Sequence, residues 1–298
     1  MHKTFLAFLV AASFCLTALG AVAQVARPPQ PCASSVRYGE NALAGQRATV
    51  NGISMYYETY GKGPPLLLIH GNGGSIDAMR CQIEHFSRSY RVIAADNRSH
   101  GKTDNGPGTL TYEQMTDDLA ALLEKLKIEK VDIIGQSDGA ILALLLAMRY
   151  PSQVRAVVAS GPNLRPDAVA DWAVAWIEKD LKNAEAMLAK GDKSQDWARI
   201  KQWNELMLHE PHIATSDLKK IQAAVLIMGG DDDIIPLDHL LEIYRNTPMA
   251  QLCIMPGATH FMLREEHELY NLMAERFLRQ PFLRPTSKQS LEREAQSD

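Results

Sequence analysis

Six short aliphatic runs, separated by segments of helical pattern, constrain the fold of this chain more than any other feature. The runs span residues 66–69, 91–95, 131–134, 154–159, 225–228 and 251–255. They are predominantly apolar, which suits strands buried on both faces, as in a parallel sheet covered by helices. Because helical segments alternate with them, the chain predicts a doubly wound α/β fold.

The helical segments carry local signals of their own. Thr111-Tyr112-Glu113-Gln114 has the pattern of a capping box and predicts that a helix begins there. Residues 140–148 are apolar all round, so we expect the most buried helix of the fold at that position. Residues 165–222 contain no strand pattern and predict several short helices, which we interpret as a helical lid inserted between two strands.

The first 23 residues predict a secretory signal peptide, in which Lys3 precedes an apolar stretch and small residues occupy the cleavage positions 21–23. Cleavage would leave no stretch apolar enough to span a bilayer, so we expect a secreted or periplasmic protein without a stable membrane anchor. The rest is expected to comprise a linker over 24–46, one domain over 47–282 and a disordered tail over 283–298.

Composition narrows the class of partner. The chain has 298 residues with 31 Lys and Arg against 35 Asp and Glu, which gives a formal net charge of −4. Binding to phosphate backbones needs clustered Lys and Arg, and the sequence shows no such cluster, so nucleic acid is excluded as the main partner. A small-molecule substrate is expected instead.

Cysteine usage agrees with export. Cleavage would leave Cys32, Cys81 and Cys253, which permit one disulfide in an oxidising compartment. Cys253 lies in an aliphatic run and is expected to be an inert core thiol. Cys32 and Cys81 are the possible pair, but the pairing stays open because the sequence does not place their Cα atoms within bridging distance.

One short motif predicts chemistry. Gly135-Gln136-Ser137-Asp138-Gly139 lies between an aliphatic run and the most apolar helix. G-x-S-x-G in a strand–turn–helix context is typical of a nucleophile elbow, which holds the serine hydroxyl clear of the sheet. An ordinary βα turn is the alternative, but the two apolar flanks favour Ser137 as a nucleophile.

A serine nucleophile needs a base, and the base needs an acid that orients it. His260 follows the last aliphatic run and is the predicted base. Three aspartates, Asp231, Asp232 and Asp233, follow the run before it, and the chain order Ser, Asp, His suits this architecture. A solvated acidic loop is the alternative reading, and no carboxylates at calcium-loop spacing support a metal site.

A glycine-rich turn at His70–Gly74 follows the first run. Backbone N–H groups of Asn72 and of Asp138, the residue after the nucleophile, are predicted to form an oxyanion hole. The turn lacks the Gly-Lys-Ser/Thr ending and the G-x-G-x-x-G spacing of phosphate-binding loops, so no cofactor is expected. His70 is expected to be structural, and the role of His100 stays open.

With these motifs in this order, the chain resembles the α/β-hydrolase superfamily, in particular its lid-bearing branch of serine-dependent esterases and C–C bond hydrolases. The resemblance covers residues 47–280 and includes the motif Asp96–Gly101, which departs from the family pattern because Ser99 stands where Gly is usual. It implies a mostly parallel sheet with an inserted helical lid.

The resemblance also bears on the acid. Counting from the strand and Gly230, the family pattern favours Asp233, whereas counting back from Pro236 gives Asp232, and both stay open. Epoxide hydrolases and haloalkane dehalogenases are disfavoured, since those relatives carry Asp where Ser137 stands.

Together these features predict an exported serine hydrolase that cleaves an ester, thioester or lactone of a small, apolar substrate. A C–C hydrolase, perhydrolase or acyltransferase would use the same triad, and a ligand-binding protein of this fold is the alternative without catalysis. At least one tryptophan of the predicted lid is expected to face the substrate. The four are Trp172, Trp176, Trp197 and Trp203.

Overall fold

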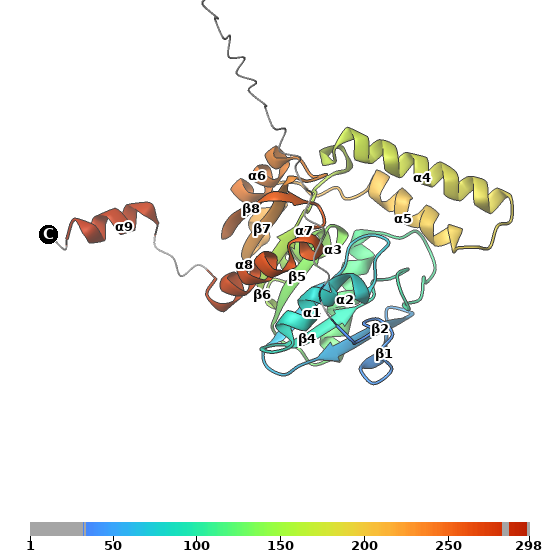
Figure 1. Ribbon diagram of the computed structural model, residues 1–298, viewed down its shortest axis with the longest axis horizontal. Helices are drawn as coiled ribbons and strands as arrows, with labels where there is room; N and C mark the ends of the chain where they lie inside the picture. Colours follow the sequence, from blue (N-terminus) through green and yellow to red (C-terminus); the bar gives the residue numbers. More distant parts are fainter. Residues whose placement is uncertain (1–31, 33, 282–285, 297–298) are drawn as a thin grey trace, which may run out of the picture.

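A single mixed sheet forms the centre of the molecule in the computed structural model, which describes residues 32, 34–281 and 286–296 (Figure 1). The predicted signal peptide lies outside the described residues. The strands are β1 Gly45–Val50, β2 Ile53–Tyr60, β3 Pro65–Ile69, β4 Arg91–Ala95, β5 Val131–Gln136, β6 Val154–Ser160, β7 Ala224–Asp232 and β8 Ala250–Thr259. Their spatial order is β1-β2-β4-β3-β5-β6-β7-β8. β2 is antiparallel to both neighbours and the other pairs are parallel, which confirms the predicted fold class.

Helices cover both faces of the sheet. Their bounds are α1 Arg80–Phe86, α2 Tyr112–Lys125, α3 Asp138–Arg149, α4 Asp171–Ala189, α5 Trp197–His209, α6 Leu237–Asn246, α7 Met262–Glu265, α8 His267–Arg279 and α9 Ser287–Glu294, with short 3₁₀ helices at Ile76–Met79, Pro166–Ala168 and Asp217–Lys220. α2, α3 and α6 share one hydrophobic core with the sheet, and α1, α7 and α8 share a second. The two cores lie on opposite faces, as expected of strands buried on both sides.

Two of the helix predictions are confirmed. The Thr111 side chain accepts a hydrogen bond from the Gln114 N–H at 3.1 Å and so caps the N-terminus of α2. α3 is buried at every position except Arg149. A helix that is apolar all round must lie inside the fold, because every face of it is costly to expose.

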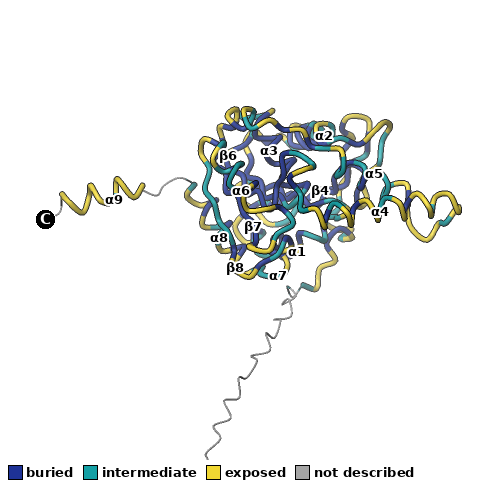
Figure 2. Tube along the Cα trace, turned by 90° about the horizontal axis from the view of Figure 1, so that it is seen from above, coloured by how far each residue is buried: buried dark blue, intermediate teal, exposed yellow. Residues whose placement is uncertain are grey.

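Only helices occur between β6 and β7 in the described chain, and we call this segment, residues 161–223, the helical insertion. Its two main helices, α4 and α5, form a hairpin that projects from the sheet, and much of α4 is exposed (Figures 1 and 2). The prediction of several short helices was wrong for α4, which spans 19 residues. Asn204 of α5 donates to Asp180 of α4 at 2.9 Å and joins the pair.

The edge strands differ from the predictions. β8 lies at the edge of the sheet, so most of its residues are only partly buried, and Cys253 is a half-buried free thiol rather than a core thiol. At the other edge lies the β1–β2 hairpin, which was not predicted because its strands mix apolar and polar residues.

The linker prediction was wrong for the part that the structure describes. Tyr38 is buried in a core, and Glu58 of β2 accepts hydrogen bonds from the N–H groups of Gly39 and Asn41 at 2.8 and 3.0 Å. A disulfide joins Cys32 to Cys81 of α1, with the Cα atoms 5.5 Å apart. Residues preceding β1 are therefore fastened to the sheet and to α1 by polar and covalent links.

The tail also differs from the expectation of disorder. Residues 287–294 form α9, whose capping box pairs the Thr286 side chain with the Gln289 N–H and the Gln289 side chain with the Thr286 N–H. This local signal is independent of burial, since α9 has no buried residue. Within the described residues, none of the helices combines the length and the apolar character that crossing a bilayer requires.

Candidate active site

Ser137 occupies a strained turn between β5 and α3. Its backbone has φ 55° and ψ −121°, a region that residues other than glycine rarely adopt. A Cβ on Gly135 would overlap the carbonyl of Gly139, and a Cβ on Gly139 would overlap the carbonyl of Ile69. The glycines are therefore required by close backbone approach, and the turn has the geometry of a nucleophile elbow.

His260 lies just beyond β8 with a carboxylate behind it. Its Nδ1 is 2.6 Å from Oδ1 of Asp233, and both side chains are withdrawn from solvent. Because the carboxylate accepts, the hydrogen of the neutral ring belongs on Nδ1, and Nε2 is left as the acceptor. Nε2 has no hydrogen-bond partner among the described residues. This arrangement suits a base that takes a proton from a serine.

The structure places Asp233, and not Asp232, against His260. The Asp233 carboxylate also accepts hydrogen bonds from the N–H groups of Ile235 at 3.0 Å and Gly230 at 3.3 Å, which hold it in place. Asp232 is exposed at the end of β7. Asp233 is thus the aspartate after β7 that contacts His260.

The glycine-rich turn after β3 lies against the elbow. A Cβ on Gly71 would come within 3.0 Å of the Ser137 Cβ, so the backbone of this turn passes beside the nucleophile. Asn72 extends its side chain to Asp138, with Nδ2 to Oδ2 at 2.9 Å. The two residues predicted to supply oxyanion N–H groups are therefore in direct contact through their side chains.

Ser137 and His260 line one cavity of about 430 Å³ beneath the helical insertion. Trp176, Trp197 and Trp203 also line it, whereas Trp172 lies outside this lining and is 67% exposed. Four polar side chains of the insertion also line the cavity and were not predicted from the sequence. These are Asp180, Asn183, Gln195 and Asn204.

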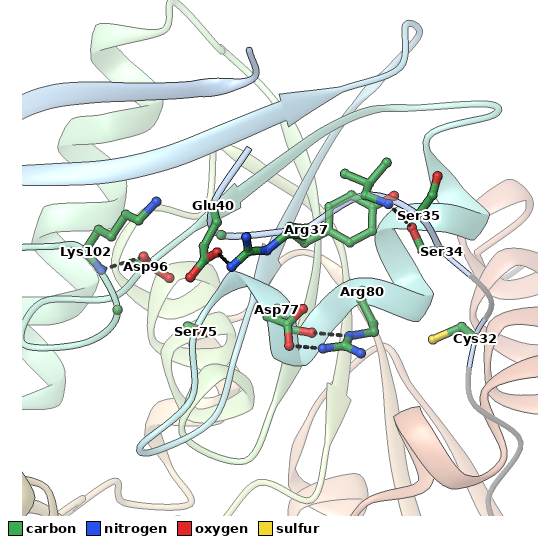
Figure 3. A pocket seen from close by; sticks show the side chains of 14 residues that line it. Cys32, Ser34, Ser35, Arg37, Glu40, Ser75, Asp77, Arg80, Asp96 and Lys102 are labelled. Atoms are coloured by element: carbon green, nitrogen blue, oxygen red, sulfur yellow. Dashed lines mark hydrogen bonds and ion pairs between the residues drawn. The ribbon is translucent and has the colours of Figure 1, made fainter. Parts of the chain in front are cut away.

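A larger cavity of about 640 Å³ lies elsewhere, between residues 34–40 and the 3₁₀ helix Ile76–Met79 (Figure 3). Four of its charged side chains form ion pairs, Arg37 with Glu40 and Arg80 with Asp77. Neither Ser137 nor His260 lines this cavity. Size alone therefore does not identify the site, and the predicted nucleophile and base line the smaller cavity.

His70 and His100 support the loops and do not reach the reacting groups. Burial lowers the pKa of His70, which donates from Nδ1 to the Gly71 carbonyl at 2.8 Å and accepts at Nε2 from the Asn97 N–H at 3.1 Å. Burial likewise lowers the pKa of His100 to about 3. His100 stacks on Trp203, with ring centroids 4.9 Å apart. Both imidazoles are neutral and structural.

Ser99, where the superfamily usually has Gly, adopts φ 65°. This is the left-handed region, which explains the family preference for glycine. The Ser99 carbonyl accepts from Nε1 of Trp203 at 3.0 Å, so this turn seats α5. Over the described residues, no group of three or more His, Cys, Asp or Glu side chains could hold a metal ion.

Comparison with known proteins agrees with the fold. The family model for the α/β hydrolase fold matches residues 64–196. Human serine hydrolase BPHL is 27% identical over 80% of this chain and 87% of its own length. The 2-hydroxy-6-oxo-2,4-heptadienoate hydrolase of Pseudomonas putida is 26% identical over 80% and 97%.

Solved structures show the same fold. The α/β hydrolase MGS-M2 from a deep-sea metagenome library superposes with a TM-score of 0.72 at 18% identity, over 81% of this chain and all of that one. The enol-lactonase of Burkholderia xenovorans superposes with a TM-score of 0.67 at 20% identity, over 79% of this chain and all of that one. From the sheet order, the elbow and these matches, the chain has the α/β-hydrolase fold, and the relatives it resembles include enzymes named as hydrolases.

Proposed function

We propose that this protein is an exported serine hydrolase that cleaves a carboxylic ester, thioester or lactone through an acyl-enzyme. One observation carries the proposal: Ser137 and His260 line the same cavity. Nδ1 of His260 is bound to Asp233, and its Nε2 is unpaired among the described residues. A base whose Nε2 is free to accept a proton, in the same cavity as an elbow serine, is the arrangement that acyl transfer requires.

Each residue then has a defined task. Ser137 Oγ attacks the carbonyl carbon while Nε2 of His260 takes its proton, and Asp233 stabilises the imidazolium that forms. N–H groups of Asn72 and Asp138 bind the developing oxyanion. His260 then protonates the leaving alcohol, and water attacks the acyl-enzyme with the same base, which returns Ser137 to its starting state.

Three tryptophans in the cavity support a substrate with an apolar or aromatic group. The polar side chains beside them would anchor one or two polar atoms of it, as is usual in pockets of this size. The helical insertion acts as the lid in this proposal, because it supplies more than half of the lining residues beyond the nucleophile.

Export is part of the proposal. The disulfide Cys32–Cys81 supports it, since disulfides persist in oxidising compartments and are rare in a reducing cytosol. Purification from the periplasm or medium, with the mature N-terminus read by mass spectrometry, tests it. A chain that begins at Met1 and stays in the cytosol would overturn it.

Ester cleavage is tested with p-nitrophenyl esters of increasing acyl length and a fluorophosphonate serine probe. The wild type should turn over at least one ester and label at Ser137, and Ser137→Ala should do neither while it keeps the wild-type melting temperature. Residual turnover of about 10³-fold over water is compatible with a missing nucleophile. Failure of the wild type to label would favour a ligand-binding protein.

C–C bond hydrolysis is the second candidate, because a named C–C hydrolase of P. putida matches 97% of its own length to this chain. The same triad serves both reactions, so only the substrate decides. Assaying a vinylogous 1,5-diketone beside the esters separates them. A kcat/KM for the diketone well above that for every ester would replace the ester proposal.

A further inference from the structure

Asp138 has a buried carboxylate, whereas the proposed mechanism uses only the backbone N–H of this residue. The residue is 3% exposed and is the first residue of α3, directly after Ser137. Its side chain is held by two neutral donors, the Asn72 amide at 2.9 Å and the Tyr112 hydroxyl. Burial raises the pKa of this carboxyl to about 6, although both donors oppose the shift. A carboxylate kept in such surroundings calls for a reason beyond packing.

Asn72 adds links that reach outside its own turn. Within the turn, the Gly71 carbonyl accepts from His70 Nδ1 at 2.8 Å and from the Gly74 N–H at 3.1 Å, whereas the glycines on either side of Asn72 have no side chain to contact other elements. The Asn72 side chain supplies two links, one to Asp138 and one to the carbonyl of Trp203 at 3.2 Å. The turn is thereby tied to both α3 and α5 at the residue whose N–H is proposed to bind the oxyanion.

The link to α5 reaches further into the helical insertion. Trp203 donates from Nε1 to the Ser99 carbonyl at 3.0 Å and stacks on His100. The first full turn after Trp203 carries Met207, another residue of the cavity lining. A displacement of α5 would therefore act on Asn72 directly. The Asn72 side-chain amide joins α5 to the glycine-rich turn that carries the proposed oxyanion donor.

We propose that Asn72 and Asp138 are positioning residues of the oxyanion hole. Their side chains keep its two backbone donors in place and connect them to α5. The inference rests on the proposed serine hydrolase function. An oxyanion hole works only if its donors are already placed where the negative charge develops. The side-chain contact joins the two donor residues, which lie 66 positions apart in the sequence.

Three variants separate geometry from charge. Asn72→Ala removes the amide and leaves the backbone N–H in place. Asp138→Ala removes the acceptor. Asp138→Asn keeps the shape, with an oxygen for Asn72 and an N–H₂ for the Tyr112 oxygen, and removes only the charge. Asn246→Ala is the matched control, because its amide also donates to a carbonyl, that of Glu242 at 2.9 Å, but on α6 and outside the cavity.

We expect Asn72→Ala and Asp138→Ala each to lower kcat roughly 10- to 100-fold on the best p-nitrophenyl ester, because misplaced donors cost rate more than binding. KM should change by less than about threefold, since the contact acts in the transition state. The double variant should be no slower than the slower single variant, because both break one contact. Asp138→Asn should restore most of the kcat lost in Asp138→Ala.

A transition-state analogue supplies the readout that a purely structural role would not move. An aryl trifluoromethyl ketone forms a hemiketal with the serine, and its oxyanion occupies the same hole. Its Ki should rise across the variants in proportion to the fall in kcat/KM. Asn246→Ala should leave both quantities at the wild-type value.

The outcomes are distinguishable. A wild type that neither turns over an ester nor labels at Ser137 overturns the proposed function itself. An active wild type whose Asn72→Ala variant keeps its kcat and Ki overturns only the positioning role. The positioning role is also overturned if the losses of kcat multiply in the double variant. It is overturned as well if activity falls in parallel with melting temperature in these variants and in Asn246→Ala alike.

Discussion

Gly161 lies directly against the imidazole ring of His260. A Cβ atom at position 161 would come within 2.7 Å of Cε1 and 2.8 Å of Nδ1 of that ring. Gly161 is the residue after β6 and has φ 61°, and its N–H is bound to the Met228 carbonyl at 2.8 Å. The ring of the proposed base is thus confined between this backbone and the Asp233 carboxylate.

Gly161→Ala is expected to displace the His260 ring, because the backbone beneath it is fixed by β6 and β7. A displacement of this size in a proton-transfer group should lower kcat/KM roughly 10- to 100-fold. Steady-state kinetics on a p-nitrophenyl ester measures it. Gly191→Ala is the control, since Gly191 also has positive φ at 68° but has open space at its Cβ position.

Both glycine variants should cost about 1–2 kcal/mol of stability for the left-handed backbone alone, which urea denaturation reports. Only Gly161→Ala should also lose activity. Equal activity in the two variants would show that the His260 ring adjusts freely, and that Gly161 has no part in placing it.

Asp233→Asn should lower kcat by a factor on the order of 10⁴, because an amide in that position no longer holds the catalytic tautomer of His260. Asp232→Asn should stay within about twofold of wild type, because Asp232 is exposed and outside the contact with the ring. Kinetics of the two variants side by side decide the acid. Collapse of Asp232→Asn alone would move the assignment by one residue.

Asp138→Asn is expected to stabilise the protein above pH 6. Burial raises the pKa of Asp138 to about 6, whereas the unfolded chain has the ordinary value of 3.8. The unfolded state therefore loses this proton first, and the unfolding free energy falls as pH rises from about 4 to about 6. Tyr112 of α2 and His260 are the titratable groups that face the carboxylate, and both favour its ionised form.

Chemical denaturation of wild type and Asp138→Asn at pH 4 and pH 7.5 measures this cost. The variant should gain roughly 1–3 kcal/mol relative to wild type between the two pH values. No gain would mean that the carboxylate is compensated in the folded state. The same variant should keep most of the wild-type kcat, because its amide oxygen still accepts from Asn72.

Replacing both cysteines of the disulfide should lower stability relative to wild type only under oxidising conditions, in which the wild type keeps the bond. Cys32→Ser/Cys81→Ser is expected to lose about 2–4 kcal/mol, since the bond closes a loop between residues 49 positions apart. Thermal denaturation with and without dithiothreitol measures it, and the reductant should bring wild type down to the variant. A variant equal to wild type without reductant would show that Glu58 and its hydrogen bonds hold this segment alone.

The tryptophans should divide into two groups when each is replaced by alanine. Trp176 and Trp197 line the cavity, so their variants should change the ratio of kcat/KM between aryl or long-chain esters and acetate. Trp172→Ala should leave this ratio unchanged, because Trp172 lies outside the lining, although it is about as exposed as Trp176. If no variant changes the ratio, the rings pack the insertion and do not select substrate.

The sequence by itself determined strands β3 to β8 of the sheet, the buried helix and the elbow at Ser137. Strands buried on both faces leave predominantly aliphatic runs, and the elbow needs glycine where another backbone segment approaches it closely, so both features can be found in the local sequence. His260 could be found in the same way, because it follows the last run.

Only the tertiary structure decided the relationships between distant residues. Which of three consecutive aspartates meets His260 depends on how the loop after β7 closes, and the half-buried state of Cys253 depends on β8 lying at an edge. Gly161 and the Asn72–Asp138 contact carry no local pattern at all. The spacing of apolar residues along the chain indicates which faces of each helix or strand are buried. Only the packing of these elements brings loops from distant parts of the sequence together at the carboxyl ends of the strands.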